Sequence, residues 1–243
     1  MKALLSSLER HCRLSPEERA AIGTLREAPP VRVPARQTTL SEGDKPGAVR
    51  LLAQGWACRF KDLPDGRRQI VGLLLPGDFF DPGLPPMQEM DHSVAALTPI
   101  AYHTIPPEAL ERLVREEPGI ADAFARHAHV GAAIHREWLL NLGRRNAFER
   151  LAHLFLEIFT RLRSHGDDCE MECDCPLTQN DLADATGVTS VHLNRTMQEL
   201  RREGLVELKS KRLFIRDYDR LAQVAMFNPN YLQVGHETRI FAQ

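Results

Sequence analysis

The spacing of apolar residues divides the chain into a first part with the pattern of short strands and a second part with the pattern of helices. Twelve of the 16 prolines lie between Pro29 and Pro107, where glycines are also frequent. Short apolar runs separated by turn residues every ~8–12 positions are typical of a β-sandwich or barrel. Before this region, Ser15-Pro16-Glu17-Glu18 predicts the start of a helix. The runs expected to form strands are residues 49–53, 69–75, 94–97 and 100–105.

A helical periodicity begins at Gly119, and no proline occurs from there to Ser164. Alternating steps of four and three residues place six side chains on one face of a helix of about 24 residues, about 36 Å long. This length exceeds the core of a small domain, and a period of ~3.5 is that of paired helices. We therefore expect a dimer interface, with a core helix as the alternative. The face consists of Ile120, Phe124, His127, Gly131, Ile134 and Trp138.

Further along the chain, Gly143-Arg144-Arg145-Asn146 interrupts this pattern. A second amphipathic helix is predicted over Ala147 to Arg163. The polar and acidic segment 164–176 that follows is expected to be a loop or an irregular connection.

The segment Leu177–Arg216 has the pattern of two short helices and a hairpin. Thr178 with Asp181 indicates an N-terminal cap, and Gly187 allows the tight turn before a second helix. That helix is expected to begin near Thr189, to end at Gly204 and to bury Leu193, Met197 and Leu200. Two strands, 205–208 and 213–216, follow it. The order predicts a helix-turn-helix with a β-hairpin wing.

Composition narrows the class of protein. The 243 residues carry 31 Lys and Arg against 33 Asp and Glu, a net charge of −2, with 43% hydrophobic residues. These values exclude a collagen-like or wholly disordered chain. No apolar run reaches the ~18–20 residues of a membrane span, and the N-terminus becomes charged too soon for a signal peptide. With an odd number of cysteines, five, we expect reduced thiols, a cytoplasmic protein and no membrane partner.

Charge is distributed unevenly within this chain. From Thr189 to Arg216 there are seven Lys and Arg and three Glu, a local charge of +4. Basic side chains there are suited to neutralise phosphates of double-stranded DNA, and an Arg on the outer helix face can bind a guanine edge. Helix N-termini add phosphate contacts. The residues expected to contact DNA are Thr178, Gln179, Thr189, Ser190, Val191, His192, Asn194, Arg195, Lys209, Lys211 and Arg212.

The order of these parts resembles the CRP/FNR family (cAMP receptor protein and fumarate-and-nitrate regulator) of bacterial transcription regulators. The matching pieces are Leu74-Leu75-Pro76-Gly77-Asp78-Phe79-Phe80, Ala95-Ala96-Leu97-Thr98-Pro99, the long helix and Leu177 to Arg216. The resemblance implies an α+β fold and a homodimer that binds DNA, with RNA polymerase as a partner if the protein is an activator. The implied parts are a cyclic-nucleotide-binding-like β-roll (a double-stranded jelly roll) over residues 1–118, a dimerisation helix and hinge over 119–145, and a winged helix-turn-helix over 146–243.

Departures from the family pattern bear on the ligand. Members that bind cyclic nucleotides have a Gly-Glu pair and an Arg-Ser pair, and here the corresponding positions are Asp81-Pro82 and His92-Ser93. Proline has no carboxylate for a ribose hydroxyl, and a neutral His replaces a permanent cation. We therefore expect no response to cAMP. Asp78, Asp81, His92 and Ser93 remain candidates for binding another effector, and local hydrogen bonding by His92 is the alternative.

The readout of bases is also expected to differ. The resemblance assigns base contacts to a Glu and an Arg four residues apart, and these positions hold Val191 and Arg195. Valine offers only apolar contact, for example with a thymine methyl. We expect another preferred DNA site, with Ser190 or His192 contributing to its readout.

The cysteines suggest one alternative function. The N-terminal iron–sulfur site of oxygen-sensing members is not expected, because only Cys12 lies near the N-terminus. Cys169, Cys173 and Cys175, with His165 as a fourth ligand, are candidates for binding a metal or sensing redox state; free thiols are the other interpretation. No axial pair marks haem, and Cys58 is expected in the core. The sequence contains no phosphate loop, nucleophile elbow or paired metal-binding histidines, so we expect no enzyme. The effector is unknown.

Overall fold

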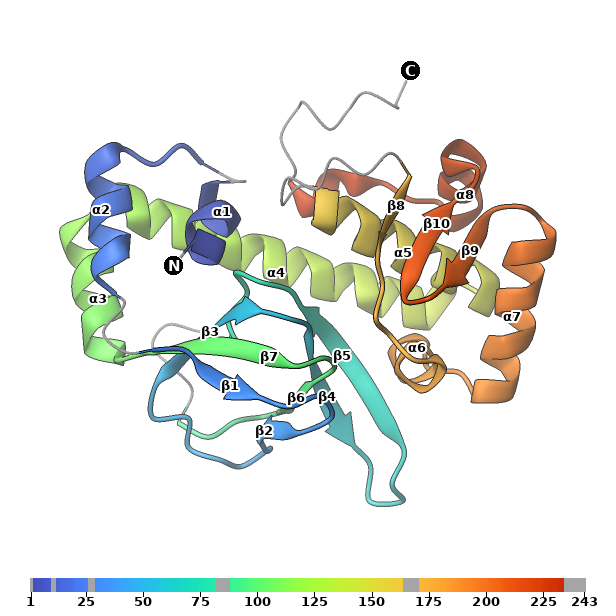
Figure 1. Cartoon of the computed structure of the whole chain (residues 1–243), viewed down its shortest axis with the longest axis horizontal. Coiled ribbons are helices and arrows are strands. Elements are labelled where there is room, and N and C mark those ends of the chain that lie inside the picture. The colour runs from blue at the N-terminus through green and yellow to red at the C-terminus, as the bar shows by residue number, and fades with distance from the viewer. Residues whose placement is uncertain (1, 10–11, 26–28, 82–87, 164–170, 234–243) are drawn as a thin grey trace. The chain divides into compact units, whose positions relative to one another are not determined.

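The computed structural model describes residues 2–9, 12–25, 29–81, 88–163 and 171–233 (Figure 1). The chain divides into two compact units, Met1–Ala132 and Ala133–Gln243, with the division inside helix α4 (Pro118–Arg144). No helix among the described residues is long and apolar enough to cross a membrane.

Two antiparallel sheets form the β-roll of the first unit. One has the strand order β1-β7-β3, with β1 (Val31–Val33), β7 (Ile100–Ile105) and β3 (Val49–Gln54). The other has the order β2-β6-β4-β5, with β2 (Thr38–Leu40), β6 (Ser93–Ala96), β4 (Ala57–Asp62) and β5 (Arg68–Leu74). The four predicted strands are thus confirmed within one or two residues, and β1, β2 and β4 were not predicted.

The first unit has two apolar cores. One lies among side chains of the two sheets, and the other is shared by the helices and one sheet. It joins α1 (Lys2–Glu9), α2 (Pro16–Thr24), α3 (Pro107–Glu116) and the first turns of α4 to side chains of β3 and β7. Helix α2 begins as predicted, because Glu18 N donates to Ser15 Oγ at 3.1 Å and Ser15 N donates to the Glu18 carboxylate at 2.7 Å.

The predicted dimer face of α4 is directed toward its own chain. Ile120 and Phe124 are buried in the core with α1 and α3, and His127 Nδ1 lies 3.4 Å from Ser7 Oγ. Trp138 is buried and donates to Glu157 of α5 (Ala147–Arg163). The expectation of a dimer seam is therefore wrong for these residues. The physical reason is that a 3–4 spacing marks an apolar face but not what covers it. Gly131 and Ile134 are half-buried.

The break between α4 and α5 lies within the predicted interruption at residues 143–146 but is shorter, and α5 has the predicted bounds. Gly143 is helical, and the break falls at Arg145 and Asn146. Asn146 Oδ1 accepts from Phe148 N and Glu149 N at 2.9 and 3.0 Å, which caps α5. Helix α5 is buried from Leu151 to Leu162, so it is the central helix of the second unit.

The segment predicted as a loop contains a strand. β8 (Glu172–Asp174) pairs with β10 (Arg212–Ile215), which also pairs with β9 (Val206–Lys209). Cys173 faces inward between two acidic residues, so the loop expectation is wrong there: the alternation of a three-residue strand was hidden by its charges. Residues 164–170 lie outside the described part of the chain. The unit ends with α8 (Tyr218–Ala225) and the 3-10 helix η1 (Pro229–Leu232).

Candidate nucleic-acid interface

Two capped helices build the predicted helix-turn-helix. In α6 (Gln179–Thr186), Asp181 N donates to Thr178 Oγ1 at 3.2 Å and Thr178 N donates back to the Asp181 carboxylate at 2.7 Å. Gly187 then takes φ 64°, a left-handed conformation that favours glycine. Helix α7 (Ser190–Arg202) begins where Thr189 Oγ1 accepts from His192 N at 3.2 Å. The two helix starts and the turn agree with the sequence prediction.

Helix α7 separates an inner from an outer face. Leu193, Thr196 and Leu200 are buried, whereas Met197, predicted to be inside, is half-buried. On the outer face Val191 is 65% exposed, so most of its apolar surface is not covered by the rest of its domain. Of the other predicted contact residues of this helix, Ser190, His192 and Arg195 are exposed and Asn194 is half-exposed.

Some polar side chains here are already engaged with their neighbours. Ser190 Oγ donates to Asn180 Oδ1 at 3.1 Å, a bond that joins the start of α7 to α6. The predicted phosphate contacts Thr178 and Gln179 lie at the N-terminus of α6, where Thr178 serves as the cap and Gln179 is exposed. The first turn of a helix is favourable for an anion.

The wing differs slightly from its prediction. Strands β9 and β10 are shifted by one residue, and the turn between them is only Ser210 and Lys211, with φ of 50° and 63°. Two successive positive φ values suit a tight hairpin turn. Lys209 and Lys211 are both exposed on this wing.

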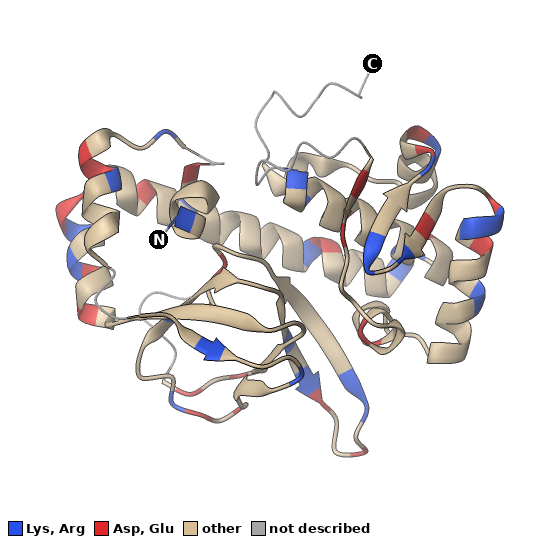
Figure 2. Ribbon diagram, viewed as in Figure 1, with Lys and Arg blue, Asp and Glu red and all other residues tan. Residues whose placement is uncertain are grey.

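Lys and Arg recur along α7 and the wing (Figure 2), and their ion pairs divide them into two groups. Arg212 binds Glu172 at 2.7 Å and Asp174 at 3.0 Å, and Arg216 binds Glu207 at 2.6 Å. Arg195, Lys209 and Lys211 form no ion pair with any described residue. The phosphate contact expected of Arg212 would break two ion pairs, so we place Arg212 in the framework that holds β8 on the wing.

Arg150 also supports the helix-turn-helix, and sequence reasoning missed it. Its guanidinium donates to Thr186 O at the end of α6 and to Arg145 O at 2.8 Å. It therefore connects the α4–α5 junction to the turn of the helix-turn-helix, and desolvation lowers its pKa. Only the position of the Asn146 cap could have indicated this, because it fixes which face of α5 Arg150 occupies.

Candidate effector residues of the β-roll bond to their own unit. His92 is buried; its Nδ1 lies 2.5 Å from Asp91 Oδ1 and its Nε2 lies 3.3 Å from Phe80 O. The bond to His92 is the main cause that lowers the pKa of Asp91. This is the local hydrogen bonding weighed as the alternative for His92.

The neighbouring candidates are engaged in the same way. Asp78 Oδ2 accepts from Leu75 N at 2.8 Å across the turn at Gly77, and Ser93 Oγ accepts from Glu42 N at 3.0 Å. Asp81 is buried, and Pro82 lies outside the described residues. Arg59, which was not predicted, donates to Phe79 O at 2.7 Å and to Phe80 O at 3.1 Å. Arg59 lies on β4, a strand that was not predicted, so the sequence did not indicate that it approaches these carbonyls.

The cysteines offer no assembled metal site in the part of the chain that the structure describes. Cys173 and Cys175 are buried, and burial raises the pKa of the Cys175 thiol to about 12. A protonated buried thiol is a poor nucleophile and a poor ligand. Cys169 and His165 lie outside the described residues. Cys58 is buried as predicted, and Cys12 is half-buried.

Comparisons with known proteins agree with both units. The family model of the cyclic nucleotide-binding domain matches residues 30–117, and that of the Crp-like helix-turn-helix domain matches residues 149–224. The transcriptional activator protein FnrL of Cereibacter sphaeroides is 33% identical over 195 residues, which cover 79% of this chain and 78% of FnrL. The chain belongs to the CRP/FNR family of bacterial transcription regulators.

Other members of the CRP/FNR family resemble the chain in sequence and fold. The nitrogen fixation regulation protein FixK of Bradyrhizobium diazoefficiens is 30% identical over 176 residues, 71% of each chain. The structure of FixK2 from Bradyrhizobium japonicum superposes with a TM-score of 0.70 at 24% identity, covering 80% of this chain and 96% of FixK2. The protein is thus a DNA-binding transcription regulator of the CRP/FNR family, and its α+β fold is that of a cyclic-nucleotide-binding β-roll and a helix-turn-helix domain.

Proposed function

We propose that this protein is a homodimeric, cytoplasmic transcription activator that binds a two-fold symmetric operator through α7 of each protomer. The observation that carries the proposal is the outer face of the winged helix-turn-helix, where Arg195, Lys209 and Lys211 are exposed and form no ion pair with any described residue. Activation is inferred from FnrL, which is named a transcriptional activator, and it would require contact with RNA polymerase.

Base readout is assigned to the first turns of α7. A recognition helix in the major groove presents its N-terminal residues to base edges. Arg195 has the donors for guanine O6 and N7, and Val191 has the apolar surface for a thymine methyl. His192, Asn194 and Ser190 lie beside them, while Thr189, Thr178, Gln179 and the wing lysines are assigned to phosphates.

Dimerisation is assigned to a different face of α4 from the one predicted. Leu139 is 70% exposed and Leu142 is 37% exposed, so both leucines leave apolar surface of α4 uncovered in the single chain. They continue a series at alternating steps of three and four residues, the spacing of paired helices. A two-fold interface would use the same face of both copies. The series is Ala125, Ala128, Ala132, His135, Leu139 and Leu142.

We further propose that cAMP is not the signal. Arg59 and His92 direct their nitrogens to the carbonyls of Phe79 and Phe80, and Asp81 is followed by a proline. These bonds commit His92, and Arg59 beside it, to backbone carbonyls of the same unit. The metal- or redox-sensing alternative through Cys169, Cys173 and Cys175 draws no support from two buried thiols.

Selection of preferred sites from random duplex DNA tests the proposed function. We expect reduced, metal-free protein to enrich a motif of two inverted half-sites with centres about one helical turn apart. Addition of cAMP should leave the enrichment unchanged. Absence of any motif, or a motif without two-fold symmetry, would contradict the proposal.

A further inference from the structure

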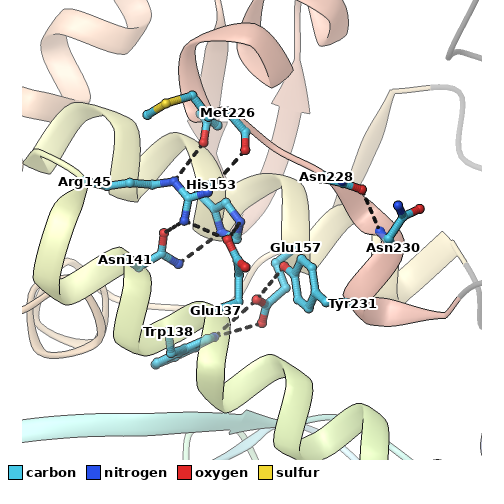
Figure 3. A network of polar contacts seen from close by, with 11 residues as sticks. Glu137, Trp138, Asn141, Arg145, His153, Glu157, Met226, Asn228, Asn230 and Tyr231 are labelled. Carbon is cyan, nitrogen blue, oxygen red and sulfur yellow. Dashed lines mark hydrogen bonds and ion pairs between the residues drawn. The ribbon is translucent and has the colours of Figure 1, made fainter.

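A cluster of buried and half-buried polar side chains in the second unit shares no member with the DNA-contact residues described above (Figure 3). It joins the last turns of α4 to α5 and to the segment after α8. All of its members belong to residues 133–243, so they form one compact unit. The cluster consists of Glu137, Trp138, Asn141, Arg145, His153, Glu157 and Tyr231.

Arg145 is the first centre of this cluster. Its Nη1 donates to Glu137 Oε1 and to Asn141 Oδ1, both at 2.8 Å. Its Nε donates to Ala225 O at 3.0 Å and its Nη2 to Met226 O at 3.2 Å. The last carbonyls of a helix lack partners within it and attract a cation. Arg145 therefore fastens the end of α4 to the C-terminal end of α8.

Glu157 is the second centre and is fully buried. Trp138 Nε1 of α4 donates to both carboxylate oxygens, at 3.1 and 3.2 Å, and Tyr231 OH of η1 donates to Oε2 at 2.8 Å. Arg161 lies 3.8 Å away, and burial raises the pKa of Glu157. Leaving a buried polar group without its partners costs more free energy than the bond gains, so this geometry is strongly specified.

His153 fills the space between the two centres. Asn141 Nδ2 lies 3.1 Å from its Nδ1, and Tyr231 stacks on the ring with centroids 5.9 Å apart. Phe227 meets the ring edge-on at 5.1 Å. Burial, with Arg145 nearby, lowers the pKa of His153 to about 3. The imidazole is therefore neutral at physiological pH, and it fills the space between Asn141, Phe227 and Tyr231.

Residues 225–232, here called the C-terminal clasp, contact each of the three central residues of this cluster. Ala225 and Met226 accept from Arg145, Phe227 packs against His153, and Tyr231 donates to Glu157. The match to the helix-turn-helix family model ends at residue 224, just before the clasp begins. Helix α5, to which the clasp binds, also packs against α6 and α7. A continuous series of contacts thus runs from the last turns of α4, through Glu157 and α5, to the recognition helix.

We propose that the C-terminal clasp fixes the orientation of α7 relative to the last turns of α4, and thereby the spacing of half-sites that the dimer accepts. Tyr231 and Arg145 act as positioning residues and contact no DNA. This inference rests on the proposed dimer. In such a dimer the distance between the two recognition helices depends on the angle at the α4–α5 junction, and half-site spacing is a geometric property of that arrangement.

The test measures spacing selectivity, the ratio of affinities for the selected operator and for operators with one base pair added or removed at the centre. Tyr231→Phe removes only the hydroxyl, and Tyr231→Ala also removes the stacked ring. Tyr218→Phe is the matched control, because Tyr218 of α8 also uses its hydroxyl in a hydrogen bond to α5, here to Thr160. We expect the ratio to fall about threefold in Tyr231→Phe and about tenfold in Tyr231→Ala, and to stay unchanged in the control.

Each outcome has a separate meaning. A uniform loss of affinity at all spacings, with the ratio unchanged, would make the clasp a purely structural element and overturn the inference. An equal fall in the Tyr218→Phe control would do the same. Wild-type protein that shows no preference among spacings would instead overturn the proposed dimeric function, whatever the variants do.

Discussion

The β-roll and the winged helix-turn-helix each hold polar side chains at the positions where the family resemblance places a ligand, but they use them in opposite ways. In the β-roll, Asp78, His92 and Ser93 bond to backbone atoms of the same unit. In the helix-turn-helix, Arg195 and Lys211 are exposed and form no ion pair with any described residue. The first set stabilises a fold, and the second is available to a partner.

This difference shows that residue type alone does not distinguish a binding side chain from a structural one. Arg212 and Lys211 are adjacent basic residues of the wing, yet only Arg212 binds two carboxylates of β8. What decides is whether the fold supplies a partner within reach. Substitutions of accessible and of engaged groups should therefore have different effects.

The largest expected effect concerns the buried thiols. At pH 8 we expect Cys175 of the native protein to react with a thiol reagent at least about 1000-fold more slowly than in denaturant, because a pKa of about 12 leaves little thiolate and burial adds to this protection. Mass spectrometry of labelled peptides measures the rate. Fast labelling of native Cys175 would reopen the cysteine cluster as a sensor. Because the pKa of Cys175 is raised in the folded state, its contribution to stability is present below pH ~9 and lost as pH rises toward 12.

Arg195→Ala tests the accessible face directly. We expect affinity for the selected operator to fall about 100-fold, the upper range for one bidentate base contact, while affinity for random duplex changes far less. Arg195→Lys should restore affinity for random duplex but not the preference for the selected operator, because it keeps the charge and loses the paired donors. Fluorescence anisotropy with both duplexes checks this. An equal loss on both would assign Arg195 to a phosphate.

Sequence reasoning worked where a local rule fixes the structure. The caps at Ser15 and Thr178 and the left-handed Gly187 depend on residues within a few positions of one another, and each was predicted. The strands β3, β5, β6 and β7 were found because apolar runs and turn residues delimit them. These features require no knowledge of distant contacts.

Sequence reasoning failed where tertiary partners decide. Strand β4 alternates Arg59 and Lys61 with buried residues, and the guanidinium of Arg59 donates to the carbonyls of Phe79 and Phe80, about 20 positions away in the sequence. On α4 the buried face and the exposed Leu139 face both have helical spacing, and only the packing of α1 and α3 shows which one the chain itself covers. Likewise, the pairing of Glu157 with Tyr231 joins residues 74 positions apart.

His92→Ala tests an engaged group. Losing the contacts with Asp91 and Phe80 O, together with the cavity left behind, should lower the free energy of unfolding by about 1–3 kcal/mol. Operator affinity of the folded protein should stay within about twofold, since His92 is bonded within the β-roll and contacts no DNA. Urea denaturation and anisotropy provide the two measurements. A large change in operator affinity without a change in stability would mean that His92 transmits a signal.

Lys211→Ala has the smallest expected effect and contrasts with its neighbour. Removing one phosphate contact should weaken binding to operator and random duplex alike by a few-fold and reduce the slope of log K against log salt by about 1. Arg212→Ala should instead lower the free energy of unfolding by about 1 kcal/mol, because it releases β8 and its ion pairs are partly exposed. Salt titrations of DNA binding and thermal melts separate the two residues. If Arg212→Ala reduced the salt slope as much as Lys211→Ala and left the melting temperature unchanged, Arg212 would exchange its carboxylates for a phosphate on binding, and the distinction between engaged and accessible groups would hold only for the free protein.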